Sequence, residues 1–228
     1  MWNLLFYSPL ILCSIFILLN AQEINILDLF TIVILPDTQF YSSFYAEGFQ
    51  EQTFWACECA HDKKMNVIFV SQLGDLVHRG NKFEQDWKNA GKAMRNLLRC
   101  NLAHGFLPGN HDTDNRMKNP YHYFMKTFPL ENYQHKEWFG ESFNHADMRN
   151  TFQLFDSPQG FFRFVFIHIE YLPDTNESQS ILDWASKVLD RYSDRTALLS
   201  THEAGSDCWP WIFTNIKKLM KRHCNLIM

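Results

Sequence analysis

The chain has 228 residues and a mass of 27.1 kDa, which allows one large domain or two small ones with a substantial core. Apolar residues make up 46% of the sequence and aromatic residues 16%, which excludes a disordered or collagen-like chain. The 21 Lys and Arg against 25 Asp and Glu give a formal charge of -4 without a block of like charges, so no nucleic-acid scaffold binding is expected.

The first 22 residues carry no charged side chain, and an apolar run extends from Leu10 to Leu19. The run has the length of the apolar part of a signal peptide and is shorter than the roughly 20 apolar residues of a membrane span. We therefore predict that residues 1–21 are a cleaved signal peptide, which makes the protein secreted or lumenal. The alternatives are an uncleaved membrane anchor at residues 4–19, which would make the membrane a partner, and a buried N-terminal helix.

The cysteines do not indicate a disulfide-stapled scaffold, because six in a chain of this length are too few. Removal of residues 1–21 takes away Cys13 and leaves five of the six, an odd number in an oxidising compartment. At least one thiol is therefore expected to remain unpaired. Cys57 and Cys59 lie in a helical pattern, where side chains two residues apart do not face each other, so no disulfide is expected between them.

The first half of the chain predicts alternating strands and helices. Residues 29–35 form a continuous apolar and β-branched run that stops at a proline, which is typical of a strand buried on both faces. Apolar residues at helical spacing predict helices over residues 47–65 and 82–100, and short apolar runs predict strands over 66–70 and 104–107. This order favours a parallel sheet with crossover helices.

The second half of the chain has a different pattern. Two apolar runs over residues 151–155 and 161–169 are joined by a turn that contains Pro and Gly, which predicts an antiparallel hairpin. A helix is expected over residues 180–192 and a strand over 196–200, and residues 224–228 read as the start of a further strand. No repeat, low-complexity tract or linker is present, so we expect a single α/β domain after the leader.

Three of the predicted strands are followed directly by a polar turn. The turns are Pro36-Asp37-Thr38-Gln39, Leu73-Gly74-Asp75 and Pro108-Gly109-Asn110-His111-Asp112. Because the carboxyl ends of parallel strands lie along one edge of a sheet, we expect Asp37, Asp75, Asn110 and His111 to share one cleft. Carboxylates, an amide and imidazoles suit Mn, Fe, Zn or Mg, and a pair of divalent ions removes the cost of placing two aspartates side by side.

Together with Thr201-His202-Glu203 at the end of a later strand, these turns resemble the first four motifs of the calcineurin-like metallophosphoesterases, of the extracellular type with an Asp-x-Gln first motif. Gly-Asn-His-Asp is the most specific of them. The resemblance begins near Thr31 and assigns residues 29–228 to one phosphoesterase domain. It implies a central mixed β-sandwich flanked by helices and the hydrolysis of phosphate monoesters or diesters, with a phosphate ester as the substrate.

The resemblance also implies two divalent metal ions, of Mn, Fe or Zn, that activate a hydroxide for the reaction. Asp37 and Gln39 would hold the first ion, and Asn110 and His202 the second. Asp75 would bridge the two. The family usually has His in the position of Gln39, and a neutral amide oxygen is expected to bind the first ion more weakly.

The resemblance further implies roles for residues that neighbour the ligands. His111 would be the general acid that protonates the departing alkoxide, for which an imidazole is suited because its pKa lies near working pH. Asp112 is expected to orient the His111 ring. Arg79 is a weaker candidate for a phosphate contact, because His78 stands where the corresponding relatives have Asp.

The family's last motif, Gly-His-x-His, is expected after the strand that begins near Cys224, and the sequence ends at Met228. The resemblance therefore predicts a C-terminally incomplete domain that lacks its last strands and one imidazole donor for each metal. Such a chain is expected to bind metal weakly and to turn over slowly. The second interpretation is a catalytically silent relative that uses the same fold as a binding module.

Several candidates also have a plain structural alternative. Asp37 and Asp75 are common turn formers, and Asp37 also fits a helix N-cap. His168 alternates with phenylalanines along a predicted strand, so we expect a buried core histidine. The aromatic residues within the segment 115–143 either form a wall for a base or a lipid or pack inside the domain; they are Tyr121, Tyr123, Tyr133, Trp138 and Phe139.

Overall fold

The computed structural model describes residues 29–80, 83–113, 118–170 and 176–202, with short stretches at 214–215, 217–219 and 226–227. The predicted signal peptide, Glu203, Cys208 and Cys224 lie outside these residues. Among the described helices, none combines the length and the apolar character that a membrane crossing requires.

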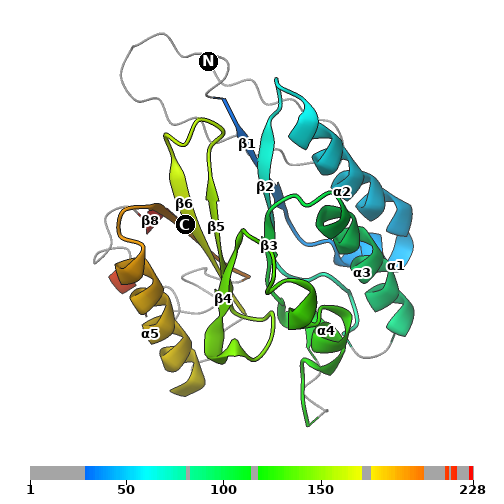
Figure 1. The fold of residues 1–228 in the computed structure, drawn as a ribbon. Helices are drawn as coiled ribbons and strands as arrows, with labels where there is room; N and C mark the ends of the chain where they lie inside the picture. Colours follow the sequence, from blue (N-terminus) through cyan, green and yellow to red (C-terminus); the bar gives the residue numbers. More distant parts are fainter. Residues whose placement is uncertain are drawn as a thin grey trace.

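A three-stranded parallel sheet, in the order β1-β2-β3, forms the first half of the fold (Figure 1). β1 (Thr31–Leu35) and β2 (Val67–Gln72) are rich in β-branched and aromatic residues, which suit a pleated and buried surface. β3 (His104–Phe106) is short. Pro36 follows β1 and has no N–H to continue the ladder, which ends the strand. The predicted parallel sheet is confirmed.

Among the described residues, three α-helices belong to this half, and two of them match the predicted ones: α2 (Ala46–His61) and α3 (Glu84–Arg99). Acidic residues in the first turn of α3 and Arg99 in its last turn complement the helix dipole. The short helix α1 (Gln39–Phe44) is not predicted by the sequence pattern. Its N-cap is Thr38, so the alternative that Asp37 caps a helix is wrong.

A disulfide joins α2 to the end of α3. It links Cys57 to Cys100, which are 43 residues apart in sequence. Cys59, two residues from Cys57, is a buried free thiol. The expectation that Cys57 and Cys59 do not pair with each other is therefore confirmed.

A five-stranded mixed sheet forms the second half, in the order β4-β5-β6-β7-β8. Its strands are β4 (Phe139–Ser142), β5 (Thr151–Asp156), β6 (Arg163–Ile169), β7 (Thr196–Thr201) and β8 (Leu226–Ile227). β5 and β6 form the predicted antiparallel hairpin, and α5 (Asn176–Arg191) leads to β7, which runs parallel to β6. β8 pairs in parallel with β7, in agreement with the predicted start of a strand. β4, which pairs with β5, is not predicted.

The two sheets pack face to face, with α1, α2 and α3 on one outer side and α5 on the other (Figure 1). Phe69 on β2 stacks on Phe155 of β5 with ring centroids 4.3 Å apart, and it meets Phe166 of β6 at 5.3 Å. Such interleaved aromatic rings account for much of the heavy phenylalanine content. The mixed β-sandwich flanked by helices is thus the observed fold.

Two histidines are buried in the core, and one of them bonds across the two sheets. His168 on β6 is fully buried, and its Nε2 lies 2.9 Å from Ser71 Oγ on β2. His104 on β3 is also fully buried and donates its Nδ1–H to the carbonyl oxygen of Leu102 at 2.8 Å. Burial lowers the pKa of His168 to about 3 and that of His104 to about 4, so both rings are neutral. The expectation that His168 is a core histidine is confirmed.

The segment that links the sheets packs against the core. It contains α4 (His122–Thr127), which is not predicted by the sequence pattern. Tyr133 is 1% exposed and Trp138 is 7% exposed, so the alternative of an open aromatic wall is wrong for these two residues. The other three aromatic residues considered above are partly buried against the same core.

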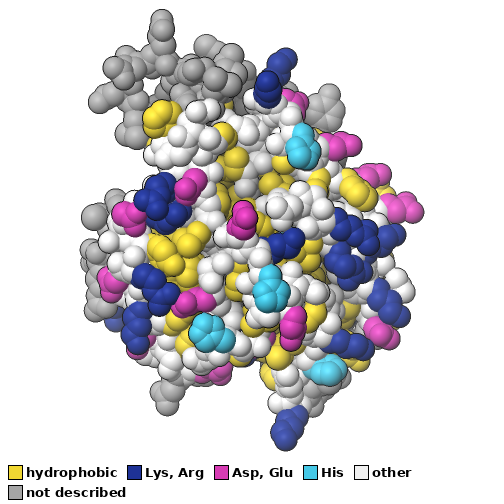
Figure 2. Space-filling view, in the orientation of Figure 1, with side chains coloured by type: hydrophobic (Ala, Val, Ile, Leu, Met, Phe, Trp, Pro, Cys, Tyr) yellow, Lys and Arg dark blue, Asp and Glu magenta, His cyan; other side chains and the backbone are white. Residues whose placement is uncertain are grey.

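The surface carries charges of both signs. Figure 2 shows Lys and Arg close to Asp and Glu over one face, with apolar side chains exposed between them. Six large apolar side chains are exposed among the described residues: Phe40, Phe44, Tyr45, Phe54, Phe83 and Phe161. Three of these belong to α1 or to its C-cap, directly after the polar turn that follows β1.

Candidate active site at the strand ends

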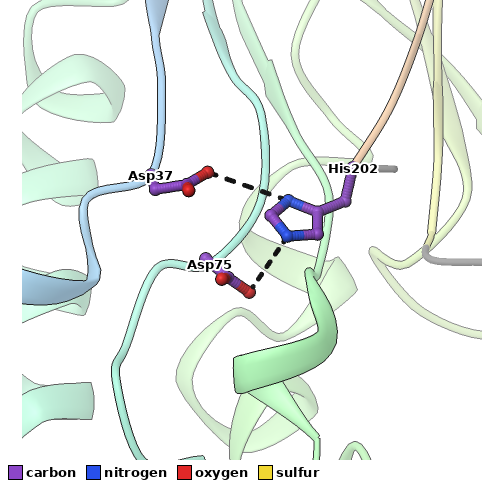
Figure 3. A group of neighbouring side chains, drawn as sticks. All are labelled: Asp37, Asp75 and His202. Carbon is purple, nitrogen blue, oxygen red and sulfur yellow. Dashed lines mark ion pairs between the residues drawn. The ribbon is translucent and has the colours of Figure 1, made fainter. Parts of the chain in front are cut away.

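Polar residues from four strand ends meet at one edge of the sandwich. Asp37 follows β1, Asp75 follows β2, Asn110 follows β3 in the short helical turn Asn110–Asp112, and His202 follows β7. One donor atom from each of Asp37, Asp75 and His202 lies within 4.8 Å of the others (Figure 3). The expected convergence of these strand ends is therefore observed, and His202 adds a residue from the second sheet.

His202 presents one ring nitrogen to the site, and a hydrogen bond of the other nitrogen to the backbone fixes the orientation of the ring. Its Nδ1–H donates to the carbonyl oxygen of Leu73 at 2.9 Å, because a carbonyl oxygen can only accept. Its Nε2 lies 3.1 Å from Asn110 Oδ1 and 3.4 Å from Asp75 Oδ1. Burial alone lowers the pKa of His202, but the hydrogen bond and charge of Asp75, with smaller contributions from Leu73 and Asp37, raise it to about 9. The surroundings of this ring thus attract positive charge.

Glycine is required at two positions next to Asp75: Gly74 on the same turn and Gly109 on the turn after β3. Gly74 has φ +96°, and a Cβ there would lie 2.6 Å from His202 Nδ1. A Cβ on Gly109 would collide with the carboxylate and the backbone nitrogen of Asp75. Asp75 itself has φ 50°, a conformation that Asp tolerates better than most residues do. The Gly-Asp and Gly-Asn pairs therefore allow the two turns to approach each other closely.

The two carboxylates differ in exposure. The side chain of Asp75 is 3% exposed and that of Asp37 is 54% exposed. Partial burial raises the pKa of Asp37, and the charge of Asp75 raises it further, while His202 opposes both effects. A carboxylate whose ionisation is disfavoured by a neighbouring carboxylate gains from a cation between the two.

Gln39 contacts the site through Asp75. Its amide Nε2 donates to Asp75 Oδ2 at 3.2 Å, and its Oε1 accepts from His78 Nδ1 at 2.9 Å. The amide oxygen that the resemblance assigns to the first metal is therefore turned toward His78 in this structure. Gln39 is 8% exposed, and in this orientation it holds the Asp75 carboxylate and the His78 ring in place.

His111 is anchored at two points. Its backbone N–H donates to Asp75 Oδ1 at 2.9 Å, which ties the turn after β3 to the turn after β2. Its Nδ1–H donates to the carbonyl oxygen of His78 at 2.8 Å. The ring nitrogen that remains for a substrate is therefore Nε2.

The expectation that Asp112 orients the His111 ring is wrong. The Asp112 side chain is buried and accepts backbone N–H bonds from Leu76 at 3.0 Å, from Val77 at 2.9 Å and from Gly109 at 2.9 Å. Burial and the charge of Asp75 raise the pKa of Asp112 to about 7, against the three N–H donors. Asp112 thus holds together the backbones of the turns that carry Asp75 and Asn110, and the partner of the His111 ring is the His78 carbonyl.

His78 is the residue of the site that sequence reasoning missed. Its ring stacks on His111 with centroids 5.2 Å apart and an interplanar angle of 16°. The sequence signal for it is its place on the same turn as Asp75, three residues further on. Its neighbour Arg79, the weaker phosphate candidate, places its guanidinium 4.3 Å from the centre of the Phe83 ring.

The donor set fits divalent cations. Asp75 Oδ1 and Asn110 Oδ1 are acceptors, and His202 Nε2 becomes one when the ring gives up its proton to make room for a cation; the three atoms face one another from three different turns. A ligating histidine commonly donates its second ring N–H to a backbone carbonyl, as His202 does. Oxygen and imidazole donors suit Mn, Fe and Zn. Asp37 supplies a further oxygen, which lies within 4.8 Å of donor atoms of Asp75 and His202, and the resemblance assigns this oxygen to the first of the two expected ions.

Comparison with known proteins gives a consistent picture. A family model described as calcineurin-like phosphoesterase matches residues 30–224. YvnB of Bacillus subtilis, an uncharacterized protein, is 30% identical over 176 residues, which cover 77% of this chain and 13% of YvnB. The chain therefore spans about an eighth of the length of that relative.

Two solved structures share the fold at low sequence identity. A dimetal phosphatase from Danio rerio has a TM-score of 0.53 and 15% identity, and the match covers 87% of this chain and 79% of that one. A 5'-nucleotidase from Candida albicans has a TM-score of 0.53 and 11% identity, with 86% and 39% covered. The motif residues, the fold and the family match agree, and the chain belongs to the calcineurin-like phosphoesterase family.

Proposed function

We propose that this chain hydrolyses phosphate monoesters or diesters, with divalent metal ions held by Asp37, Asp75, Asn110 and His202. The observation that carries the proposal is the convergence of three atoms that can ligate a metal, Asp75 Oδ1, Asn110 Oδ1 and the deprotonated His202 Nε2, from three different strand ends. The dimetal phosphatase and the 5'-nucleotidase among the structural neighbours are named for reactions of this class, which supports the proposal.

The ligand side chains are held before any ion or substrate arrives. Asp75 accepts from the backbone N–H of His111 and from the amide of Gln39, and His202 is fixed by Leu73. When bound, divalent cations lower the pKa of coordinated water and offset negative charge on phosphate oxygens. A site that is already in position needs little reorganisation for this role.

The proton for the leaving group comes, in this proposal, from His111. The bond from its Nδ1–H to the His78 carbonyl fixes the ring and leaves Nε2 to donate to the departing oxygen. Its backbone N–H is bonded to Asp75, so the donor and the metal ligands belong to one rigid unit. The ring is half-buried and thus retains access to solvent and substrate.

The test is metal-dependent turnover. The chain is incubated with Mn, Zn or Fe(II), and release of nitrophenol is followed from p-nitrophenyl phosphate and from bis(p-nitrophenyl) phosphate. We expect turnover with metal only, abolished in Asp75→Asn and retained in the control Asp183→Asn, whose carboxylate lies on the exposed face of α5. Equal activity in Asp75→Asn, or activity that survives chelation, would contradict the proposal.

One outcome of the same experiment separates the enzyme from the second interpretation. If the chain binds the ions, if Asp75→Asn abolishes that binding, and if neither ester is cleaved, the protein is a silent phosphoesterase-fold binding module. If hydrolysis occurs, the ratio of the two rates distinguishes a monoesterase from a diesterase.

We also propose that the protein is secreted or lumenal. The Cys57–Cys100 disulfide supports this location, because disulfides persist in oxidising compartments. Residues 1–21 supply the predicted signal peptide. Protein recovered from the medium of secreting cells is expected to begin at Gln22. A chain that begins at Met1 and stays in the membrane fraction would favour the anchor instead.

A further inference from the structure

A row of aromatic rings leads away from His111. His78 stacks on His111, with centroids 5.2 Å apart and planes inclined by 16°. Phe40 on α1 lies 4.9 Å from His78 at 35°, and Phe44, one turn further along α1, lies 6.3 Å from Phe40 at 20°. We call His111, His78, Phe40 and Phe44 the ring row.

The outer end of the ring row is open to solvent. Phe40 is 56% exposed and Phe44 is 69% exposed, whereas Phe106 and Phe124 in the core are fully buried. Two exposed phenyl rings in contact with each other, next to a polar site, form an apolar surface of the kind that covers part of a ligand. The hydrolytic function proposed above makes no use of this surface.

Hydrogen bonds to neighbouring residues fix the ring row in place. His78 donates its Nδ1–H to Gln39 Oε1, which sets the plane of the ring. α1 is tied to the turn after β2 through Ser42, whose hydroxyl donates to the Leu76 carbonyl at 2.6 Å. The surface is therefore held in position before a ligand binds, which lowers the entropic cost of binding.

We propose that the ring row is the subsite for the leaving group of the substrate, and that this leaving group carries a planar aromatic ring such as an aryl group or a nucleobase. The inference rests on the proposed hydrolytic function. A general acid contacts the leaving-group oxygen, so the leaving group lies on the His111 side of the phosphorus. His78 and Phe40 are the next rings on that side.

The arrangement of the rings favours a flat ligand over an acyl chain. Aromatic rings stack offset on one another and gain attraction beyond the area that they bury. Stacking on an aromatic side chain also tolerates different bases, because every base has a π-face. Successive planes in the row are inclined by 35° or less, so a planar group can continue the stack.

The test measures binding without turnover. Three phosphonates, in which carbon replaces the leaving-group oxygen, are titrated into the Mn-loaded chain by calorimetry: phenyl-, cyclohexyl- and methylphosphonate, with inorganic phosphate as a reference. We expect phenylphosphonate to bind about tenfold more tightly than methylphosphonate and more tightly than cyclohexylphosphonate, which matches it in size but is not flat. The phenyl advantage is expected to vanish in Phe40→Ala and to persist in Phe40→Tyr.

A matched control comes from Phe161, which is 73% exposed in the turn between β5 and β6, at the opposite edge of the sheet from His202. Phe161→Ala is expected to keep the wild-type order of affinities. Equal binding of the three phosphonates, cyclohexylphosphonate as tight as phenylphosphonate, or an unchanged phenyl advantage in Phe40→Ala would overturn the subsite and leave the phosphoesterase proposal standing. Failure to bind phosphate and all three phosphonates would overturn both proposals.

Discussion

Asp112 lies next to His111 in the sequence and yet turns its carboxylate away from the His111 ring, toward the backbone N–H groups of Leu76, Val77 and Gly109. Gly-Asn-His-Asp predicts which side chains gather at the strand ends because their chemistry is recognisable. The motif does not predict what each atom contacts. That depends on the path of a neighbouring turn 36 residues away in sequence. The sequence likewise does not predict the contact of Gln39, whose amide oxygen faces His78, a residue outside the recognised motifs.

Replacement of the buried Asp112 tests its structural role. In Asp112→Asn an amide NH2 replaces one of the two accepting oxygens, so at least one buried backbone N–H loses its partner. We expect the free energy of unfolding to fall by about 2 kcal/mol, the usual cost of a buried unsatisfied donor. Urea unfolding measures the change, with the exposed Asp183→Asn as a control that should stay within about 0.5 kcal/mol of wild type. Wild-type stability in Asp112→Asn would show that the three bonds do not hold the turns.

His111→Ala tests the proton donor. The variant keeps the backbone N–H that binds Asp75, so the metal content is expected to be unchanged. Cleavage of phenyl phosphate, whose leaving group needs a proton, should fall by about 100-fold or more. Cleavage of p-nitrophenyl phosphate should fall far less. The exposed His135→Ala serves as the control. An equal loss for good and poor leaving groups would remove the proton-donor role from His111.

At the scale of elements, the sequence pattern predicts those helices and strands that are long or rich in β-branched residues. β1, β2, the β5–β6 hairpin, α2, α3 and α5 all follow from periodicity, because burial against the opposite sheet or helix imposes it. The sequence could not predict α1, whose six residues are mostly aromatic or Ser and have little helix propensity. The position of α1 is instead set by its contacts with Leu76 and His78, which lie on the turn after β2. The edge strand β4 includes a glycine and lacks a clear alternation.

The two buried histidines of the core predict a loss of stability in acid. The pKa values of His168 and His104 fall from 6.5 to about 3 and about 4 on folding, so the unfolded chain binds more protons below pH 6.5. The contribution of the two rings to stability should be full above pH 6.5 and should fall by about 1.4 kcal/mol per pH unit for each ring as the pH drops from there toward 4. Urea midpoints between pH 4.5 and pH 7.5 measure the slope.

His168→Gln isolates one of these two rings, because glutamine can still bond Ser71 and does not titrate. The slope of stability against pH is expected to be smaller by about 1.4 kcal/mol per pH unit in this variant. Asp112, whose pKa is raised to about 7, gives a slope of the opposite sign in both proteins, so the difference between them isolates His168. His202, whose pKa is raised to about 9, affects the slope only above pH 6.5 and so does not mask the effect. A slope that His168→Gln leaves unchanged would mean that the acid sensitivity arises elsewhere.

At the scale of the whole molecule, the sandwich brings residues of both sheets to one edge. Asp37, Asp75 and Asn110 come from the first sheet and His202 from the second, so the site forms only when the two sheets pack. The resemblance predicts this arrangement. Periodicity alone predicts separate parallel and antiparallel parts, because the packing of one sheet on the other depends on interleaved aromatic rings such as Phe69 and Phe155.

The disulfide should contribute to the stability of the helical layer. It closes a loop of 43 residues between α2 and α3, and constraining such a loop in the unfolded chain is worth about 2–5 kcal/mol. The double variant Cys57→Ala/Cys100→Ala is expected to lose that much in urea unfolding. Cys59→Ala, which removes the free thiol, should leave the disulfide intact on non-reducing mass analysis. Equal stability of the double variant and wild type would contradict the prediction.

Manganese anomalous scattering from crystals grown with an excess of Mn tests the central claim most directly. The account predicts a peak about 2.0–2.3 Å from Asn110 Oδ1, His202 Nε2 and an Asp75 oxygen, with Asp37 beside a second peak that shares Asp75. Crystals that take up Mn only at other places, with these four side chains free of the ion, would contradict it.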